Sequence, residues 1–189
     1  SVIKSFMEAN GFRKGLLFTA DPYSKVMNND DKKTATLFGD GATVTLLTEN
    51  PVFDFGKFVF GSDGSKKEGI IVREDGHVHM NGRAVFTFTV RVVPDSIRKM
   101  LGKNGFALDR IDRFLLHQGS LHIVNSIADT LGVPREKCPF KSGTYGNTVS
   151  SSVPMILAQE FNNQEMQVAV LAGFGVGLSW ASTLIFREK

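Results

Sequence analysis

The chain has 189 residues, of which 42% are hydrophobic, and its formal net charge is +3. This composition predicts one well-packed domain with an appended piece, and no apolar run reaches the roughly 18–20 residues that a membrane span needs. Basic residues are scattered among acidic ones, which argues against nucleic-acid binding. The single cysteine and the lack of a recognisable signal peptide favour a reducing, cytoplasmic setting.

The first half of the chain alternates short regular stretches with turn residues. Residues 2–10 are predicted to form a helix, and residues 15–20 (GLLFTA) a buried strand. Residues 34–48 end in a β-branched run of strand type. Residues 49–79 are rich in glycine and charge, and we predict an irregular linker there.

Residues 82–101 give conflicting signals. Phe86, Phe88 and Val90 alternate with polar residues as a strand would, yet the stretch continues into the helical pattern DSIRKML. Local propensity favours a strand for the first half, and the residues alone leave both alternatives open.

The second half alternates strands with helices. Residues 112–117 (DRFLLH) have the continuous apolar middle of a strand covered on both faces, and Ser120 is a plausible N-cap for a helix that ends at residue 131. A short strand is expected around residues 137–140 (KCPF).

A helix interrupted by Pro154 is expected over residues 148–161. Residues 167–173 and 178–186 then predict two final strands joined by FGVG. This order indicates an α/β layered domain with a largely parallel sheet.

His117 follows a predicted strand and precedes a predicted helix, and ligands of open α/β sheets bind at such a place. The nearby helix end disfavours the imidazolium, and a neutral ring can donate one hydrogen bond to an oxygen that gains negative charge. The alternative is a packed histidine bonded to backbone.

Two further turns have a similar context. Asn147 lies in TYGNT, before a predicted helix, and is either an N-cap or a second amide donor at the same sheet edge. The glycine turn within residues 173–180 (GFGVGLSW) is either a tight connection or a source of oxyanion-binding backbone amides. Three such signals at successive strand ends favour a site.

Five segments, in chain order, resemble the 3-oxoacyl-(acyl-carrier-protein) synthase III family of thiolase-fold condensing enzymes. They are TATLFGDGATVTLL, HMNGRAVFTFTVR, HQGSLHIVNSIADTLGVPREK, YGNTVSSSVPMILAQ and GFGVGLSWASTLIF. The resemblance implies a thiolase-like α/β layered fold with a mixed, largely parallel sheet covered by helices, and a helix over 82–101. It divides the chain into a remnant of the N-terminal half with a linker (1–75) and a C-terminal half with the site (76–189).

The resemblance implies a Cys-His-Asn site. His117 and Asn147 would bind the thioester oxygen of a malonyl carrier protein and stabilise the enolate left by decarboxylation, which then attacks an acyl-cysteine. The backbone at Val176 matches the family's oxyanion contact. Residues that match substrate-binding positions are Met80, Gly82, Phe86, Gly119 and Ser120. The family implies acyl carrier protein or coenzyme A thioesters as partners, and it implies a homodimer. It implies neither a metal nor a cofactor.

The family's nucleophilic cysteine stands upstream of the matched segments, so we expect this chain to be the C-terminal portion of a longer enzyme, inactive by itself. Cys138 is expected to be a buried structural thiol.

There are three departures from the family pattern. Gly119-Ser120 replaces the common Ala-Asn, His122 replaces an arginine implicated in carrier-protein contact, and Val176 replaces a glycine. These departures leave open a related transferase that moves acyl groups to oxygen or nitrogen. A non-catalytic partner subunit is a third alternative, although such a subunit has no need of both His117 and Asn147.

Overall fold

The computed structural model describes residues 2–188, which form five α-helices and nine strands within that range. The helices are α1 (Val2–Asn10), α2 (Lys32–Ala35), α3 (Gly82–Asn104), α4 (Leu121–Leu131) and α5 (Ser152–Glu160). The strands are β1 (Lys14–Asp21), β2 (Gly41–Thr48), β3 (Phe53–Phe55), β4 (Val59–Ser62), β5 (Ile70–Val72), β6 (Val78–Met80), β7 (Arg113–Leu116), β8 (Val168–Gly175) and β9 (Ser179–Arg187). Short 3-10 turns are η1 (Tyr23–Lys25), η2 (Gly64–Gly69), η3 (Leu108–Arg110), η4 (Arg135–Lys137) and η5 (Val149–Ser151).

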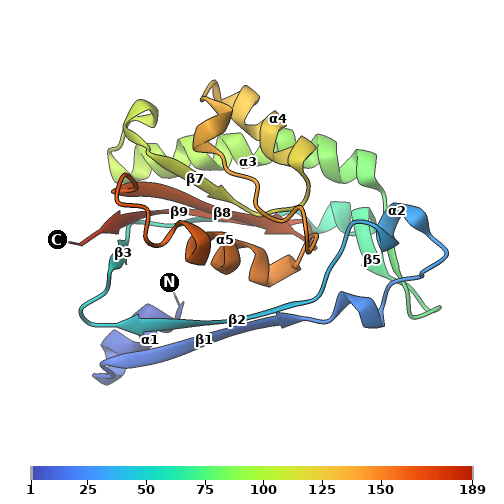
Figure 1. Ribbon diagram of the computed structural model, residues 1–189, viewed down its shortest axis with the longest axis horizontal. Coiled ribbons are helices and arrows are strands. Elements are labelled where there is room, and N and C mark those ends of the chain that lie inside the picture. Colours follow the sequence, from blue (N-terminus) through green and yellow to red (C-terminus); the bar gives the residue numbers. More distant parts are fainter. Residues whose placement is uncertain (1, 189) are drawn as a thin grey trace.

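The elements stack in layers. A central sheet of β3, β4, β9, β8 and β7 is covered on one face by α3 and α4 and on the other by α5 (Figure 1). The antiparallel pair β1–β2 lies on the far side of α5 (Figure 1). Within residues 2–188, none of the helices is long and apolar enough to cross a membrane.

The central sheet is mixed, as predicted, but the expectation that it is largely parallel is wrong. β7 and β8 run parallel, whereas β8, β3 and β4 all pair antiparallel with β9. The turn between β8 and β9 is too short for a crossover and therefore forms a hairpin. The other two antiparallel pairings come from residues 49–79, which are not the irregular linker that we predicted, because they contain β3 to β5 and the start of β6.

The core lies on both faces of the central sheet. Successive side chains of β7 point to opposite faces, so Phe114 and Leu116 pack beneath α3 and α4 while Leu115 packs towards α5. All three are fully buried. This double coverage explains the continuous apolar run in the sequence of this strand.

β1 and β2 form where strands were predicted, and they pair with each other, but β1 is not a buried strand. Its inner face meets α1 and η5, where Thr19 bonds to Ser151. Its outer face presents apolar pairs such as Phe18 with Val44, whose exposed fractions are 67% and 57%. Hydrophobic composition indicates a strand at this position but does not tell whether another layer covers it.

Residues 82–104 are helical, as the resemblance implied and contrary to local propensity. Asn81 caps α3, because its Oδ1 accepts from the Ala84 N–H at 3.0 Å. Val93, Ile97 and Met100 recur at helical spacing and are buried against the sheet. Tertiary burial of this stripe decides the conformation.

Two smaller predictions need correction. Residues 137–140 do not form a strand, since the chain there leaves η4 and continues without regular structure. The helix expected from residue 148 begins as η5 and becomes α5 at Ser152. Pro154 is the third residue of α5, where its missing N–H would have had no helical partner, and it does not interrupt the helix.

The division at residues 75 and 76 stays a prediction.

Candidate active site

His117 stands directly after β7, at the edge of the sheet where that strand ends. Its backbone N–H donates to the carbonyl of Ala172 in β8 at 2.8 Å, which continues the parallel pairing. Its ring meets Phe174 edge-on, with the ring centroids 5.2 Å apart and the planes at 85°. The predicted location at a strand end is confirmed.

The His117 ring is held neutral by its surroundings. Its Nδ1 lies 2.6 Å from the Oγ of Ser152, the first residue of α5. Burial lowers the pKa of His117 from 6.5 to about 4, and a hydrogen bond to the backbone of Val149 opposes that shift with a smaller effect. At neutral pH the ring is therefore an uncharged imidazole that donates through one nitrogen only.

The depressed pKa of His117 predicts a pH-dependent loss of stability. Because the unfolded chain binds this proton more tightly, the contribution of His117 to the free energy of unfolding is complete above pH 6.5 and is lost as the pH falls towards about 4. The loss amounts to at most about 3 kcal/mol. Urea unfolding of the wild type and of His117→Gln, at about pH 7 and about pH 4.5, measures this loss. Other groups titrate in both proteins, so the difference between the two proteins isolates His117. Equal pH dependence in the two proteins would contradict it.

Gly119 and Ser120 connect His117 to α4. The Ser120 Oγ accepts from the Ile123 N–H at 3.2 Å and caps the helix, as predicted. A methyl group added at Gly119 would lie 3.6 Å from the His117 Nε2, which is an ordinary contact distance. The residue at this position therefore lies close to the ring nitrogen that faces away from Ser152.

Asn147 is 8% exposed and is fixed by backbone and side chain. Its N–H donates to the Leu37 carbonyl at 2.9 Å, and its own carbonyl accepts from Gly39 at 3.0 Å. Its Oδ1 accepts from the Val149 N–H at 2.9 Å, so Asn147 closes a local turn and does not cap α5. The amide Nδ2 is left available as a donor.

Val149 connects the two predicted donors. Within residues 2–188 it is the one non-glycine residue with positive φ, at 52°. That conformation costs a β-branched residue roughly 1–3 kcal/mol, and such strain is found at functional sites. Its N–H donates to the Asn147 Oδ1 at 2.9 Å, and its backbone also influences the pKa of the His117 ring, so this peptide segment adjoins both side chains.

The other predicted residues lie at two further places. Val176 stands at the β8–β9 turn, beyond the end of β8 next to His117, and is 53% exposed. Met80 and Gly82 line an open hollow of about 670 Å³ at the start of α3, whose lining does not include His117 or Asn147. Phe86 stacks on His122 of α4, with centroids 4.8 Å apart and planes at 7°.

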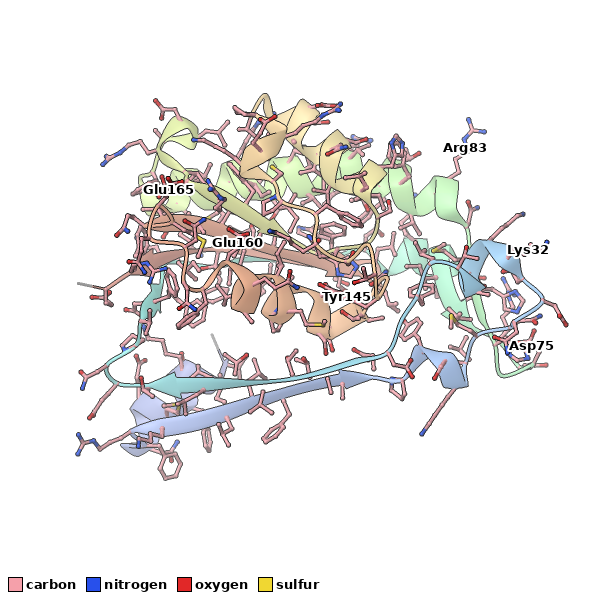
Figure 2. All side chains as sticks on the ribbon, viewed as in Figure 1. Lys32, Asp75, Arg83, Tyr145, Glu160 and Glu165 are labelled. Carbon is pink, nitrogen blue, oxygen red and sulfur yellow. The ribbon has the colours of Figure 1, made fainter. Side chains whose placement is uncertain are left out.

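Two other groups of charged side chains include residues that are labelled in Figure 2. Arg83 projects from the free start of α3, beside the hollow, and Glu160 lies at the far end of α5 (Figure 2). Glu160 is 7% exposed and pairs with Arg113 at 3.7 Å and Lys141 at 3.4 Å. Because its charge is matched on both sides, this buried carboxylate has a structural role.

Two supporting residues were not predicted from the sequence. Ser152 contacts the His117 ring, but it is one of three consecutive serines, and their order alone does not tell which one faces β7. Gln118 is 1% exposed, donates to the Leu116 carbonyl at 2.8 Å and accepts from the Lys141 N–H at 2.9 Å. Its position directly after His117 was the available signal.

Comparisons with known proteins find one family along most of the chain. The family model described as 3-oxoacyl-[acyl-carrier-protein (ACP)] synthase III C terminal matches residues 101–186, and the model described as 3-oxoacyl-[acyl-carrier-protein (ACP)] synthase III matches residues 1–64. A beta-ketoacyl-[acyl-carrier-protein] synthase III of Staphylococcus epidermidis is 35% identical over 187 residues, which cover 96% of this chain and 60% of the relative.

Solved structures show the same likeness. The 3-oxoacyl-(acyl carrier protein) synthase III of Pseudomonas aeruginosa is 30% identical, with a TM-score of 0.88 over 98% of this chain and 61% of that one. The synthase III of Aquifex aeolicus is 26% identical, with a TM-score of 0.91 and the same coverage of the two chains, 98% and 61%. This chain spans about 60% of the length of the curated relative from Staphylococcus epidermidis. It has their thiolase-like fold and belongs to the 3-oxoacyl-(acyl-carrier-protein) synthase III family.

Proposed function

We propose that this chain carries the decarboxylating half of the active site of a condensing enzyme of the synthase III type. The observation that supports it best is that two neutral donors, His117 and Asn147, both adjoin the backbone of Val149. Neutral, preorganised donors stabilise an oxygen that becomes negative during a reaction, because they need no reorganisation when the charge develops.

The proposed step starts from a malonyl thioester. The bond to its carboxylate breaks and releases CO2, and the electron pair moves through the α-carbon onto the thioester oxygen as an enolate. His117 and Asn147 donate hydrogen bonds to that oxygen. The enolate carbon then attacks the carbonyl of an acyl-cysteine, and the cysteine leaves as a thiolate, which gives a 3-oxoacyl thioester.

Cys138, the single cysteine of the chain, does not fit the role of nucleophile. It is 2% exposed within the apolar core between the sheet and α4, and burial raises its pKa to about 12. A nucleophilic cysteine needs the opposite shift, towards the thiolate. The proposal therefore assigns the acylated cysteine to a residue outside this sequence and gives this chain no condensing activity alone.

The proposal includes the substrates and setting that the family implies. Acyl and malonyl thioesters of acyl carrier protein or coenzyme A would be the substrates, without a metal or prosthetic cofactor. The sequence similarity to enzymes named for acyl carrier protein supports that partner. Homodimerisation and a cytoplasmic location stay predictions.

The test uses the protein that contains this chain together with a nucleophilic cysteine. Incubated with an acyl thioester and a malonyl thioester, it is expected to release CO2 and form a 3-oxoacyl product, identified by mass spectrometry. Cys138→Ala is expected to retain this turnover, since the thiol packs in the core. Transfer of the acyl group to an alcohol or amine without CO2 release would instead identify the related transferase, and loss of turnover in a folded Cys138→Ala variant would reject the assignment of the nucleophile.

A further inference from the structure

Ser152 is buried at the place where α5 meets the end of β7. It is the first residue of the helix and is 1% exposed. Its Oγ lies 2.6 Å from the His117 Nδ1 and 3.4 Å from the backbone nitrogen of Gln118. The hydroxyl therefore has two partners, both contributed by the segment that carries the candidate donor.

One of the two hydrogen bonds has a fixed direction. The Gln118 N–H can only donate, so the Ser152 oxygen accepts from it. The single proton of the hydroxyl is then free to be donated to the His117 Nδ1, 2.6 Å away, and in that arrangement Nδ1 accepts. In a neutral imidazole one nitrogen accepts and the other carries the proton, so the proton of His117 is placed on Nε2.

We infer that Ser152 is a positioning residue that holds His117 as the Nε2–H tautomer by donating its hydroxyl proton to Nδ1. The inference rests on the proposed function, because only a protonated Nε2 can donate to a thioester oxygen. Nε2 is the nitrogen that lies towards Gly119 and away from α5. Without this hydroxyl, Nδ1 loses the hydrogen-bond partner that keeps the proton on Nε2.

Ser151 provides a matched control for Ser152. It is the preceding serine, it is fully buried, and its Oγ bonds to the carbonyls of Thr19 and Gly41. Removal of either hydroxyl therefore disturbs a buried contact near the start of α5. Only removal of the Ser152 hydroxyl takes a partner from the imidazole.

The tautomer is measured directly by nitrogen NMR on this chain labelled with 15N-histidine, at neutral pH, with His117 assigned by comparison with His117→Gln. The wild type and Ser151→Ala are expected to show a protonated Nε2 and an unprotonated Nδ1. Ser152→Ala is expected to shift the proton to Nδ1, and Ser152→Thr, which keeps a hydroxyl, to retain the wild-type pattern.

A wild-type ring protonated on Nδ1 would overturn the inference, whether or not any variant folds. An unchanged Nε2–H pattern in folded Ser152→Ala would also overturn it. The NMR measurement needs no substrate and no turnover. A failure of the proposed condensation chemistry is therefore distinguishable from a failure of this inference.

Discussion

Replacement of His117 by alanine is expected to lower the rate of malonyl thioester decarboxylation by about 100- to 1000-fold, the usual effect of removing one oxyanion donor. The ring is neutral because burial lowers its pKa to about 4. It is fixed by contacts with Ser152 and Phe174, so its donor is preorganised and costs little reorientation in the transition state. The rate of CO2 release from a malonyl thioester, with the cysteine-bearing protein, measures the effect.

His79 is the matched histidine control. It is exposed and pairs with Asp75 at 2.8 Å on the β5–β6 hairpin. His79→Ala removes the same chemical group from the surface and is expected to change CO2 release less than twofold, since an exposed pair such as His79–Asp75 contributes little. If His117→Ala and His79→Ala decarboxylate at the same rate, His117 is a packed histidine and not a donor.

Asn147→Asp is expected to lower decarboxylation by a similar factor, at least about 100-fold. One carboxylate oxygen can still accept from the Val149 N–H, as Oδ1 does at 2.9 Å, so the local turn is kept. The second oxygen replaces the donating Nδ2 by a negatively charged acceptor, which repels the developing enolate. The measurement is again CO2 release at saturating malonyl thioester.

Asn162→Asp is the control for this change. Asn162 is exposed just after α5, and its side chain makes none of the contacts of Asn147. The Asn162→Asp substitution introduces the same charge at the surface and is expected to leave the rate of CO2 release within twofold of wild type. Full activity of Asn147→Asp would show that no donor is needed at this position.

The parts of the fold with a strong local signal were predictable from the sequence. The strand before His117 and the helix capped by Ser120 have continuous or periodic apolar patterns, and both occur where expected. Residues 82–101 were not predictable from local pattern, because burial of one stripe against the sheet outweighs the alternation at their start. The resemblance to a family supplied what local propensity lacked.

Features that depend on contacts distant in sequence were missed. The outer face of β1 contains Leu16 and Phe18 and is exposed, since nothing in the local pattern tells which layers pack on a strand. The antiparallel pairing of β3 and β4 with β9 joins segments more than a hundred residues apart, and short strands in a glycine-rich stretch give a weak signal.

In the candidate site, too, residues with a local sequence signal were predictable and residues set by distant contacts were not. His117 and Asn147 were singled out because polar residues at the ends of buried elements are visible in sequence. Ser152 and Gln118 became apparent only once α5 was packed against the end of β7, since their partners are set by that packing. The positive φ of Val149 has no sequence signal, because β-branched residues disfavour that conformation.

The most direct test of the central assignment compares two half-reactions in one protein. Cysteine acylation by an acyl thioester and decarboxylation of a malonyl thioester are measured separately for wild type, His117→Ala and Asn147→Asp. The two donors serve the enolate, so both variants are expected to retain measurable acylation while decarboxylation falls by at least about 100-fold. Equal loss of both half-reactions would contradict the roles assigned to His117 and Asn147.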